Sequence, residues 1–401
     1  MERGAKPGEI TFDKITRRSV DTFERMVQFL KTGQRLPSFD FAGVGIENGG
    51  FVPWDYDCND NRGNPNIRAS TNCKVSASPK YEPDAAGATA LMGVMAWDRW
   101  RERKYLTMAD LSIQALLSND RNPYYELHYN FGVLAAARMN QEHGYQFDLD
   151  KLLNWAFSRG KRLFPDETTA VRWTNGIIAE NWGQFPAFGL WGGKRPYRDG
   201  GRAFYMNTIH QAITLAPIVK YYPEYATMFG KYLLHVANNS KVFFPYEALA
   251  KHPNKGAIAT SDALELGWAR TDLSLYSGAV TGVFSAMMKP NSDNPEVPFW
   301  DLNISNFQSP KSFPTFLIYN PNVTPVVIRR TALPKMADSA LWDSIQNRWI
   351  AENQDGKNIT LAPGQAMVLT LVPRDSTTQI RLNKLIGTLN GIESVIDYKI
   401  N

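Results

Sequence analysis

Cysteine and histidine are scarce in this chain, and their scarcity excludes several kinds of site. The 401 residues include two cysteines and five histidines. The histidines stand too far apart for metal-ligand spacing, and the chain contains neither HExxH nor paired CxxC motifs. The histidines are His128, His143, His210, His235 and His252. We therefore expect no metal site and no zinc chemistry.

Several other signatures are also missing. The sequence has no GxxxxGK phosphate-binding loop and no GxSxG nucleophile elbow. No apolar run approaches the about 18–20 residues of a membrane span. We therefore expect no nucleotide chemistry, no cofactor and no membrane span.

Charge is not concentrated in one sign. There are 44 Lys and Arg against 39 Asp and Glu, a formal net charge of +5, and the basic residues are mostly dispersed, so nucleic acid is not expected as a partner. One basic cluster lies in a glycine-rich stretch, and it is either a solvated surface loop or a contact for an acidic sugar. Its residues are Lys194, Arg195, Arg198 and Arg202.

The two cysteines, Cys58 and Cys73, flank a loop rich in Asn, Asp and Gly. This spacing suits either a local disulfide in an oxidising compartment or two free thiols. Residues 1–30 lack the pattern of a signal peptide, but a processed chain would begin in the same way. We expect a secreted or periplasmic protein, with the cytoplasm as the alternative.

Apolar residues recur with helical spacing up to about residue 290. Two stripes, 209–219 and 225–236, are separated by Pro223 and predict a helical hairpin with a short loop. Further helices are expected near 15–32, 84–103, 107–118, 128–143, 149–159 and 275–289. Thr107, followed by Asp110, resembles a helix N-cap. Successive helices with short connections pack antiparallel, which favours an (α/α) toroid for residues 1–290.

From about Pro295 the pattern changes to short β-type runs. Residues 316–319, 326–328 and 366–372 are bounded by Pro, Asn and Gly, and Asn390-Gly391 is a hairpin signal. A chain of this length is expected to form more than one domain. We therefore predict a multidomain α plus β protein, with a toroid over 1–290 and a β-sandwich-like domain over 291–401.

Long loops rich in aromatic residues, Gly and Asn interrupt the helical pattern at 37–83, 172–203 and 252–274. Loops of this length in a compact domain are usually functional or disordered, and the tryptophans argue against disorder. Tryptophan also offers a flat apolar face that stacks on a sugar ring. We expect these loops to wall one cleft.

Four clusters contain candidate site residues. Trp54 and Asp57 lie in the first long loop, and Glu126, His128, Tyr129 and Asn130 precede or begin a helix. The third cluster contains Glu180, Trp182, Arg202, Asn207 and His210, and the fourth contains Asp262, Trp268 and Tyr276. Each has an ordinary structural alternative: an Asx turn for Asp57, a buried histidine for His128, gap filling for the tryptophans and a helix cap for Asp262.

Some of these segments also resemble a known group. Residues 122–140, 202–239, 259–278 and 313–321 (FPTFLIYNP) resemble a group of bacterial proteins similar to the six-hairpin glycosidase-like superfamily. The resemblance extends over most of the chain and implies an (α/α)6 toroid with an appended β domain. It assigns no role to any single residue.

The favoured function is a glycoside hydrolase acting on a bacterial, plant or algal glycan. Its chemistry needs two carboxyl groups across the scissile bond, for which we predict a pair among Asp57, Glu126 and Asp262. The other candidates are expected to bind the sugar; they are Trp54, Asn130, Glu180, Trp182, Arg202, Asn207, His210, Trp268 and Tyr276.

Two alternatives stay open. A polysaccharide lyase needs a base, an acid and a group that neutralises a uronic-acid carboxylate. The candidates are His128 or His210 as base, Tyr129 or Tyr276 as acid, and Asn130, Asn207 or Arg202 as neutraliser. A non-catalytic glycan-binding protein would use the same aromatic loops. The expected partner in each case is a carbohydrate, neutral or acidic.

Overall fold

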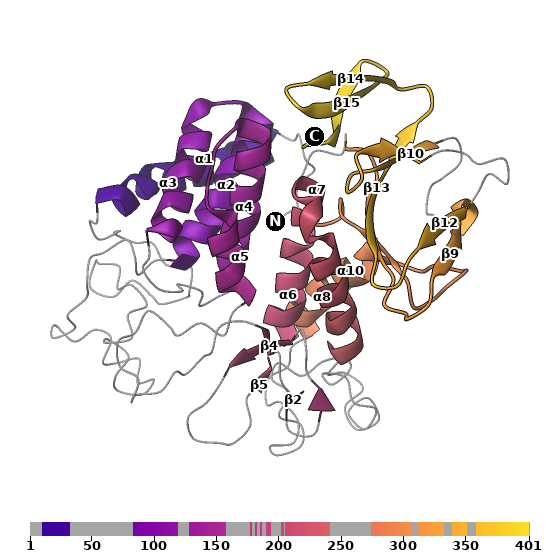
Figure 1. Cartoon of the computed structure of the whole chain (residues 1–401). Helices are drawn as coiled ribbons and strands as arrows, with labels where there is room; N and C mark the ends of the chain where they lie inside the picture. The colour runs from indigo at the N-terminus through magenta and orange to yellow at the C-terminus, as the bar shows by residue number, and fades with distance from the viewer. Residues whose placement is uncertain are drawn as a thin grey trace. The chain divides into compact units, whose positions relative to one another are not determined.

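The computed structural model of the chain (Figure 1) combines helices and antiparallel sheets. It describes residues 10–32, 83–118, 128–157, 205–240, 274–306, 312–332, 339–350 and 358–400, together with short strands between 177 and 203. The chain divides into two compact units. Unit 1 comprises Met1–Asn140 and Gly144–Gly176, and unit 2 comprises Gln141–His143 and Ile177–Asn401.

Unit 1 is helical where it is described. Its helices are α1 (Ile10–Thr32), α2 (Pro83–Trp100), α3 (Arg103–Leu117), α4 (His128–His143) and α5 (Leu149–Phe157). These lie within five residues of the predicted helices, and the largest differences are the earlier starts of α1 and α3. The last three residues of α4 belong to unit 2.

Glycines let the helices of unit 1 approach closely. A Cβ on Gly93 of α2 would lie 2.6 Å from the Tyr105 carbonyl oxygen of α3, and one on Gly87 would lie 2.0 Å from the His128 carbonyl oxygen of α4. Neither position has room for a side chain, because both neighbours are backbone atoms. The α2–α3 and α2–α4 crossings therefore depend on glycine at these points.

The predicted cap at Thr107 is wrong. Helix α3 begins four residues earlier, at Arg103, after Arg101 adopts a left-handed backbone with φ of 56°. Thr107 lies inside the helix, where its hydroxyl donates to the Arg103 carbonyl at 3.3 Å. The chain reverses sharply enough at Arg101 for α3 to start before the capping sequence is reached.

Unit 2 begins with short strands and continues with helices. The strands are β1 (Ile177–Ile178), β2 (Asn181–Trp182), β3 (Phe185–Pro186), β4 (Leu190–Gly193) and β5 (Arg202–Ala203). The helices are α6 (Tyr205–Leu215), α7 (Ile218–Tyr221), the 3-10 turn η4 (Pro223–Tyr225), α8 (Ala226–Asn239) and α10 (Ser274–Met287). The short strands were not predicted.

The predicted hairpin of residues 209–236 is present, with one difference. Pro217 interrupts the first stripe, so it forms two helices, α6 and α7, rather than one. The apolar stripes are nevertheless buried, as expected: Ile213 is 6% exposed and Phe229 and Leu233 are fully buried. Helix α6 packs against both α8 and α10.

The change from helix to strand occurs at Met288, where α10 has just ended and β6 begins. The strands that follow are β6 (Met288–Lys289), β7 (Phe299–Asp301), β8 (Thr315–Tyr319), β9 (Val326–Arg329), β10 (Ser339–Asp343), β11 (Arg348–Trp349), β12 (Asn358–Leu361), β13 (Ala366–Pro373), β14 (Thr377–Arg381), β15 (Lys384–Leu389) and β16 (Ile392–Asp397). A 3-10 turn, η6 (Arg330–Ala332), follows β9.

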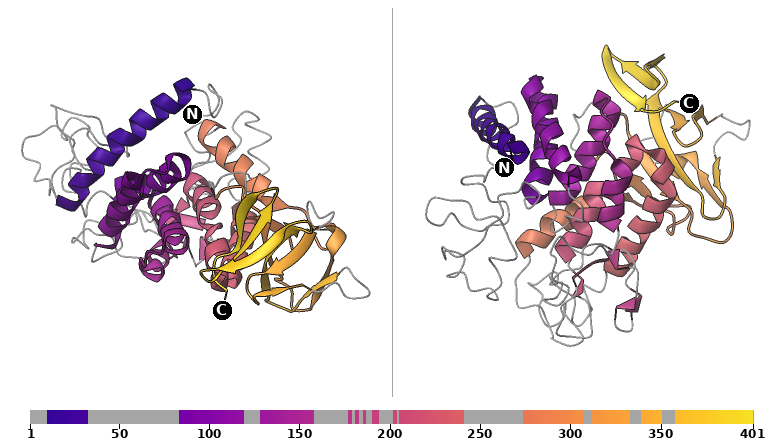
Figure 2. Two further views of the ribbon diagram at one scale, coloured as in Figure 1. Left: turned by 90° about the horizontal axis from the view of Figure 1, so that it is seen from above. Right: turned by 60° about the vertical axis from the view of Figure 1, so that its left-hand side comes forward.

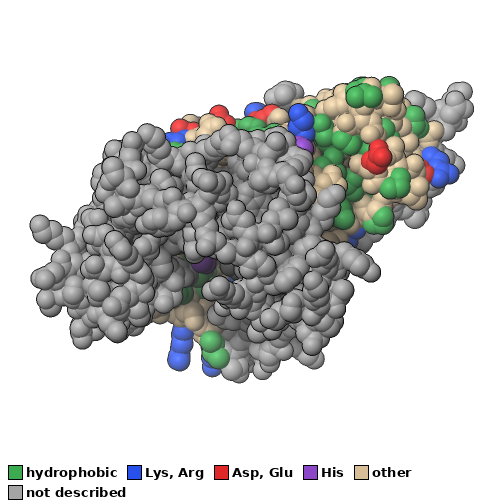
Figure 3. Space-filling model, turned by 90° about the horizontal axis from the view of Figure 1, so that it is seen from below, with side chains coloured by type: hydrophobic (Ala, Val, Ile, Leu, Met, Phe, Trp, Pro, Cys, Tyr) green, Lys and Arg blue, Asp and Glu red, His purple; other side chains and the backbone are tan. Residues whose placement is uncertain are grey.

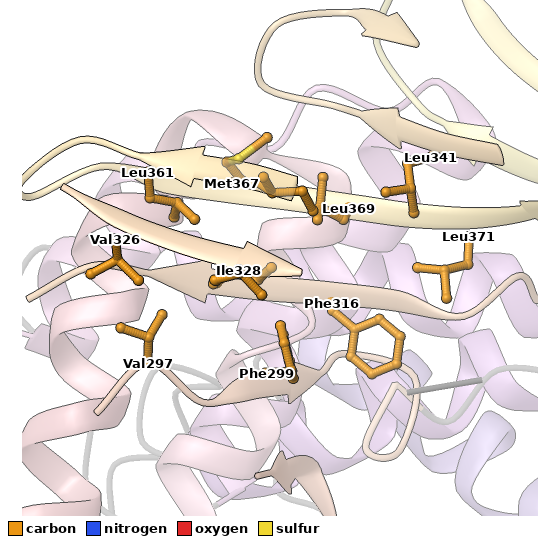
Figure 4. Packing of buried hydrophobic residues seen from close by; sticks show 12 residues of the cluster. Val297, Phe299, Phe316, Val326, Ile328, Leu341, Leu361, Met367, Leu369 and Leu371 are labelled. Carbon is orange, nitrogen blue, oxygen red and sulfur yellow. The ribbon is translucent and has the colours of Figure 1, made fainter. Parts of the chain in front are cut away.

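These strands form three antiparallel sheets. Six strands pair in the order β11-β10-β13-β8-β7-β6, β12 pairs with β9, and β14-β15-β16 form a third sheet. Every pairing among the described strands is antiparallel. The larger sheet and the β9–β12 pair face each other across one buried cluster, which Figure 4 shows.

Alternation along the strands explains this cluster. Phe316 and Ile318 of β8, and Met367 and Leu369 of β13, point into it from one sheet. The intervening residues face the other side of the sheet, since successive side chains in a strand alternate. There α8 packs on β8 and β13, and Figures 1 and 2 show it running along the sheet. The central strands are therefore buried on both faces.

The helices of unit 2 and its strands thus share one compact unit. A division of the chain at residue 290 into two domains stays a prediction. Among the helices that the structure describes, none is long and apolar enough to cross a membrane.

Candidate functional site

Several predicted site residues fall outside the part of the chain that the structure describes. They are Trp54, Asp57, Glu126, Glu180, Asp262 and Trp268, together with Cys58 and Cys73. All three candidate carboxyl groups belong to this set, so their pairing stays a prediction.

His128 lies at the first residue of α4 in unit 1. Its ring contacts the ring of Phe131 with centroids 5.9 Å apart, and burial lowers the pKa of the imidazole. A histidine with a lowered pKa is neutral at pH 7 and has a lone pair that can accept a proton. His128 is therefore in the protonation state that a general base requires.

The two residues after His128 point into the helical core of unit 1. Tyr129 and Asn130 are both fully buried. The Tyr129 hydroxyl donates a 2.9 Å hydrogen bond to the Leu152 carbonyl of α5. This geometry favours a structural role for Tyr129, which ties α4 to α5.

In unit 2, four predicted residues lie on elements that contact one another. Arg202 of β5 pairs with Gly193 of β4, and β4 packs on α6. Asn207 and His210 lie on α6, which in turn packs on α10, the helix of Tyr276. The fold therefore brings together two segments, α6 and α10, that 58 residues separate in the sequence.

His210 is the member of this group whose side chain the structure describes. It is half-buried on α6, and its Nδ1 lies 3.4 Å from the Thr214 hydroxyl one turn later. The contact restricts the orientation of the imidazole ring. His210 is thus positioned by its own helix.

Trp182 lies on a separate small hairpin. Strands β2 and β3 pair with Trp182 opposite Phe185. Among the described elements, this hairpin has no extensive packing with α6 or α10. The structure therefore does not join Trp182 to the group that contains His210.

Sequence reasoning missed a groove in unit 2. It is lined on one side by Lys231, Leu234 and His235 of α8, and on the other by the segment Met288–Pro298 and by Tyr319. The available signals were three polar residues recurring on one face of a helix and a cluster of prolines after residue 289. These patterns indicate surface shape, and neither points to a particular chemistry.

Metal binding has no support in the described residues, which contain no group of three or more His, Cys, Asp or Glu side chains that could hold an ion. The charged side chains are also scattered. On the face shown in Figure 3, the described surface at the right, over the C-terminal strands, is mostly hydrophobic or uncharged.

No protein-family model matches the chain, and no curated protein matches it. Several solved structures do. One is a glycoside hydrolase that is 9% identical over 92% of this chain and 72% of its own, with a TM-score of 0.28. Another is a GH127 β-L-arabinofuranosidase from Geobacillus stearothermophilus T6, 9% identical over 79% of this chain and 62% of its own, with a TM-score of 0.26.

A third is a GH127 β-arabinofuranosidase that is 10% identical over 81% of this chain and 65% of its own, with a TM-score of 0.24. The chain therefore spans less than two thirds of the length of both arabinofuranosidases. At these TM-scores the matches assign the chain to no family.

Proposed function

We propose that this protein is a carbohydrate-active enzyme, and specifically a glycoside hydrolase that uses a carboxyl pair from Asp57, Glu126 and Asp262. One carboxylic acid protonates the glycosidic oxygen, and the second carboxylate either attacks the anomeric carbon or activates water. A separation of roughly 5–5.5 Å gives retention of configuration, and roughly 6.5–9.5 Å gives inversion.

The observation that carries the proposal is the grouping of β5, β4, α6 and α10 in unit 2, with Arg202, Asn207, His210 and Tyr276 on three of these elements. Hydrogen-bonding and aromatic residue types on adjoining elements suit a ligand that presents hydroxyl groups and flat apolar faces. The candidate acid Asp262 precedes α10 in the same unit.

The helical scaffold we propose is an (α/α) toroid. Helices α2 and α3 are joined by two residues and pack closely, and α6 to α8 form a second hairpin. Hairpins of this kind can close into a ring in which helix ends and loops surround a cavity. The long loops at 37–83 and 252–274 then belong to the rim of this cavity.

A lyase acting on a uronic-acid glycan is the second candidate, and a specific observation favours it. His210 as base, Tyr276 as acid and Arg202 as neutraliser are all on the contacting elements of unit 2. In this reaction the base removes the proton at C5, the arginine neutralises the carboxylate and the tyrosine protonates the leaving oxygen. No carboxylate of the enzyme is required.

One experiment separates these functions. The protein is incubated with a panel of neutral and acidic oligosaccharides and aryl glycosides, including pyranosides, arabinofuranosides and uronides. Reducing ends and the ultraviolet absorbance of unsaturated sugars are followed together. A hydrolase produces reducing ends alone, a lyase produces both signals, and a glycan-binding protein produces neither but retains a sugar in a binding assay.

A variant pair then identifies the chemistry. Asp262→Asn is expected to lower the rate of hydrolysis by about 10²–10⁴ while leaving binding, and His210→Ala is expected to leave more activity than Asp262→Asn. The reverse order, with unsaturated products in the wild type, would replace the hydrolase by the lyase.

A further inference from the structure

A groove of about 970 Å³ lies in unit 2, between α8 and the chain that follows α10. Its volume lies at the upper end of the roughly 300–1,000 Å³ typical of small-molecule sites. It is made only of described residues of unit 2, from Lys231 to Pro321. None of the residues assigned to the catalytic proposal lines it.

One wall of the groove is a single face of α8. Lys231, Leu234, His235 and Asn238 follow the i, i+3, i+4, i+7 spacing that places residues on one side of a helix. Phe229, on another side of α8, is fully buried. One face of the helix therefore packs in the core of unit 2, and a second, mainly polar face lines the groove.

Tyr319 joins this helix to the sheet. It lies at the end of β8, lines the groove, and packs directly on Gly230 of α8. A Cβ on Gly230 would lie 2.4 Å from the Cβ of Tyr319, so the close contact requires glycine. The aromatic ring is therefore held in place at the point where helix and sheet meet.

The opposite wall is a fixed turn. Asn291 is buried, and its Oδ1 accepts hydrogen bonds from the backbone N–H groups of Asp293 at 3.0 Å and Asn294 at 3.3 Å, while its Nδ2 donates to the Val297 carbonyl at 3.0 Å. Asp293 in turn accepts from the backbone N–H and from Nε of Arg329, both at 2.8 Å. A wall that is already ordered costs little entropy when a ligand binds.

Prolines add to this rigidity. Pro290, Pro295, Pro298 and Pro321 line the groove together with Met288. Proline rings have a fixed backbone angle and present C–H groups without a backbone donor. They give the groove a firm, apolar surface on which the C–H face of a sugar ring can rest.

The charged side chains that line the groove are balanced in sign. Lys231 and Glu296 are its charged side chains of opposite sign. Burial, and to a lesser extent the positive charge of Lys231, lower the pKa of His235, which is therefore neutral at pH 7. An anionic ligand would gain from Lys231 and lose to Glu296, whereas a ligand that presents hydroxyl groups meets donors and acceptors of both kinds.

We propose that this groove binds a stretch of neutral saccharide, with the exposed Pro290, Pro295 and Pro321 against its apolar face and the polar side of α8 against its hydroxyl groups. The inference rests on the proposed carbohydrate substrate and adds to it a second contact outside the catalytic residues. Such a contact raises the affinity for long chains without acting on short ones.

The test is calorimetric titration of the full chain with neutral hexasaccharides (cellohexaose, maltohexaose and α-1,5-arabinohexaose), with hexagalacturonate, and with decaproline. We expect a neutral hexasaccharide to bind. Asn238→Trp fills the groove from an exposed position and is expected to weaken this binding by about tenfold or more, a loss of roughly 1.4 kcal/mol. Thr227→Trp is the matched control, since Thr227 is exposed on the same helix and does not line the groove.

His235→Ala provides a milder second variant and is expected to weaken the same binding by about threefold or more. Melting curves check that each variant is folded. The proposal is overturned if no neutral hexasaccharide binds, if the groove variants bind it as the wild type does, or if hexagalacturonate or decaproline is the ligand that Asn238→Trp displaces.

The outcomes for the groove and for the proposed function are distinguishable. Cleavage of aryl glycosides that is unchanged in Asn238→Trp, with hexasaccharide binding also unchanged, contradicts the groove site alone. Hexasaccharide binding that is lost in Asn238→Trp, in a protein that cleaves nothing in the panel, contradicts the hydrolase alone.

Discussion

The indole N–H of Trp342 donates a 2.6 Å hydrogen bond to Oδ2 of Asp397 inside the C-terminal strands of unit 2. Both residues are buried, and Trp342 also packs in a second apolar cluster with Phe313 and Leu385. Burial raises the pKa of Asp397, while the hydrogen bonds from Trp342 and from backbone N–H groups oppose this rise. The pair joins β10 to the last strand of the chain.

Replacement of Trp342 by phenylalanine should therefore destabilise unit 2. The substitution keeps most of the apolar contact and removes one donor from a buried carboxyl group, which is expected to cost about 1–3 kcal/mol. Urea unfolding measures the change. Trp349→Phe is the control, because Trp349 is 39% exposed. Equal stability of the two variants would show that the hydrogen bond contributes little.

Asp343 is predicted to destabilise the folded protein at neutral pH. Its carboxyl group is fully buried, and no described residue donates a hydrogen bond to its Oδ2. Burial raises its pKa, and the nearby Asp397 adds to the rise. An acid whose pKa is raised on folding loses stability as pH increases from the unfolded pKa, about 4, through the folded pKa.

Asp343→Asn should therefore raise the melting temperature at pH 8, and the gain should shrink as the pH is lowered toward 4. In the wild type, Oδ1 of Asp343 accepts hydrogen bonds from the backbone N–H groups of Ile345 and Gln346. The amide oxygen of asparagine can accept the same two hydrogen bonds. Asp375→Asn, at an exposed position, is the matched control. A variant that is less stable than the wild type at pH 8 would mean that the ionised carboxylate has a compensating partner.

Gly87 and Gly282 should respond in opposite ways to alanine. At Gly87 the new Cβ would lie 2.0 Å from the His128 carbonyl oxygen, so α2 and α4 must separate, and a loss of about 1–3 kcal/mol or more is expected. At Gly282, in α10, nothing lies within 4 Å, and alanine should stabilise the helix by up to about 1 kcal/mol. Thermal unfolding of both variants compares them, and stabilisation by Gly87→Ala would refute the close crossing.

The Tyr129 hydroxyl should matter for stability and little for turnover. Tyr129→Phe removes the hydrogen bond to Leu152, with an expected cost of about 0.5–1.5 kcal/mol. The turnover of the folded variant, on a substrate from the glycan panel, should equal that of the wild type. A large loss of turnover without a loss of stability would instead assign Tyr129 the role of a catalytic acid.

Local patterns predicted much of the fold. The spacing of Ile213, Phe229 and Leu233 identifies buried helix faces, and the alternating burial of β9 fits a strand with one covered face. Sequence did not reveal the break at Pro217, where a residue that can begin a helix divides an otherwise continuous stripe. It also misplaced the start of α3, because the reversal at Arg101 has no glycine to signal it.

Less of the candidate site than of the fold could be predicted from the sequence. The elements that adjoin in unit 2 do so because segments distant in the chain pack together; they are β5, β4, α6 and α10. Residue types alone indicated only that Arg202, His210 and Tyr276 are suited to a sugar. The groove could not be predicted for the same reason: Lys231 and Tyr319 line one groove because Gly230 lets α8 approach β8 closely.

Replacement of Asp262 by asparagine tests the proposed hydrolase most directly. Asparagine preserves the size of the side chain and removes its charge, so a role as acid or base predicts a loss of about 10²–10⁴ in rate with an unchanged melting temperature. The measurement is the initial rate of reducing-end formation on the best substrate of the panel, for the wild type, for Asp262→Asn and for Asp375→Asn as control. Undiminished turnover in Asp262→Asn would contradict the catalytic assignment, and a lowered melting temperature with normal turnover would identify Asp262 as a helix cap.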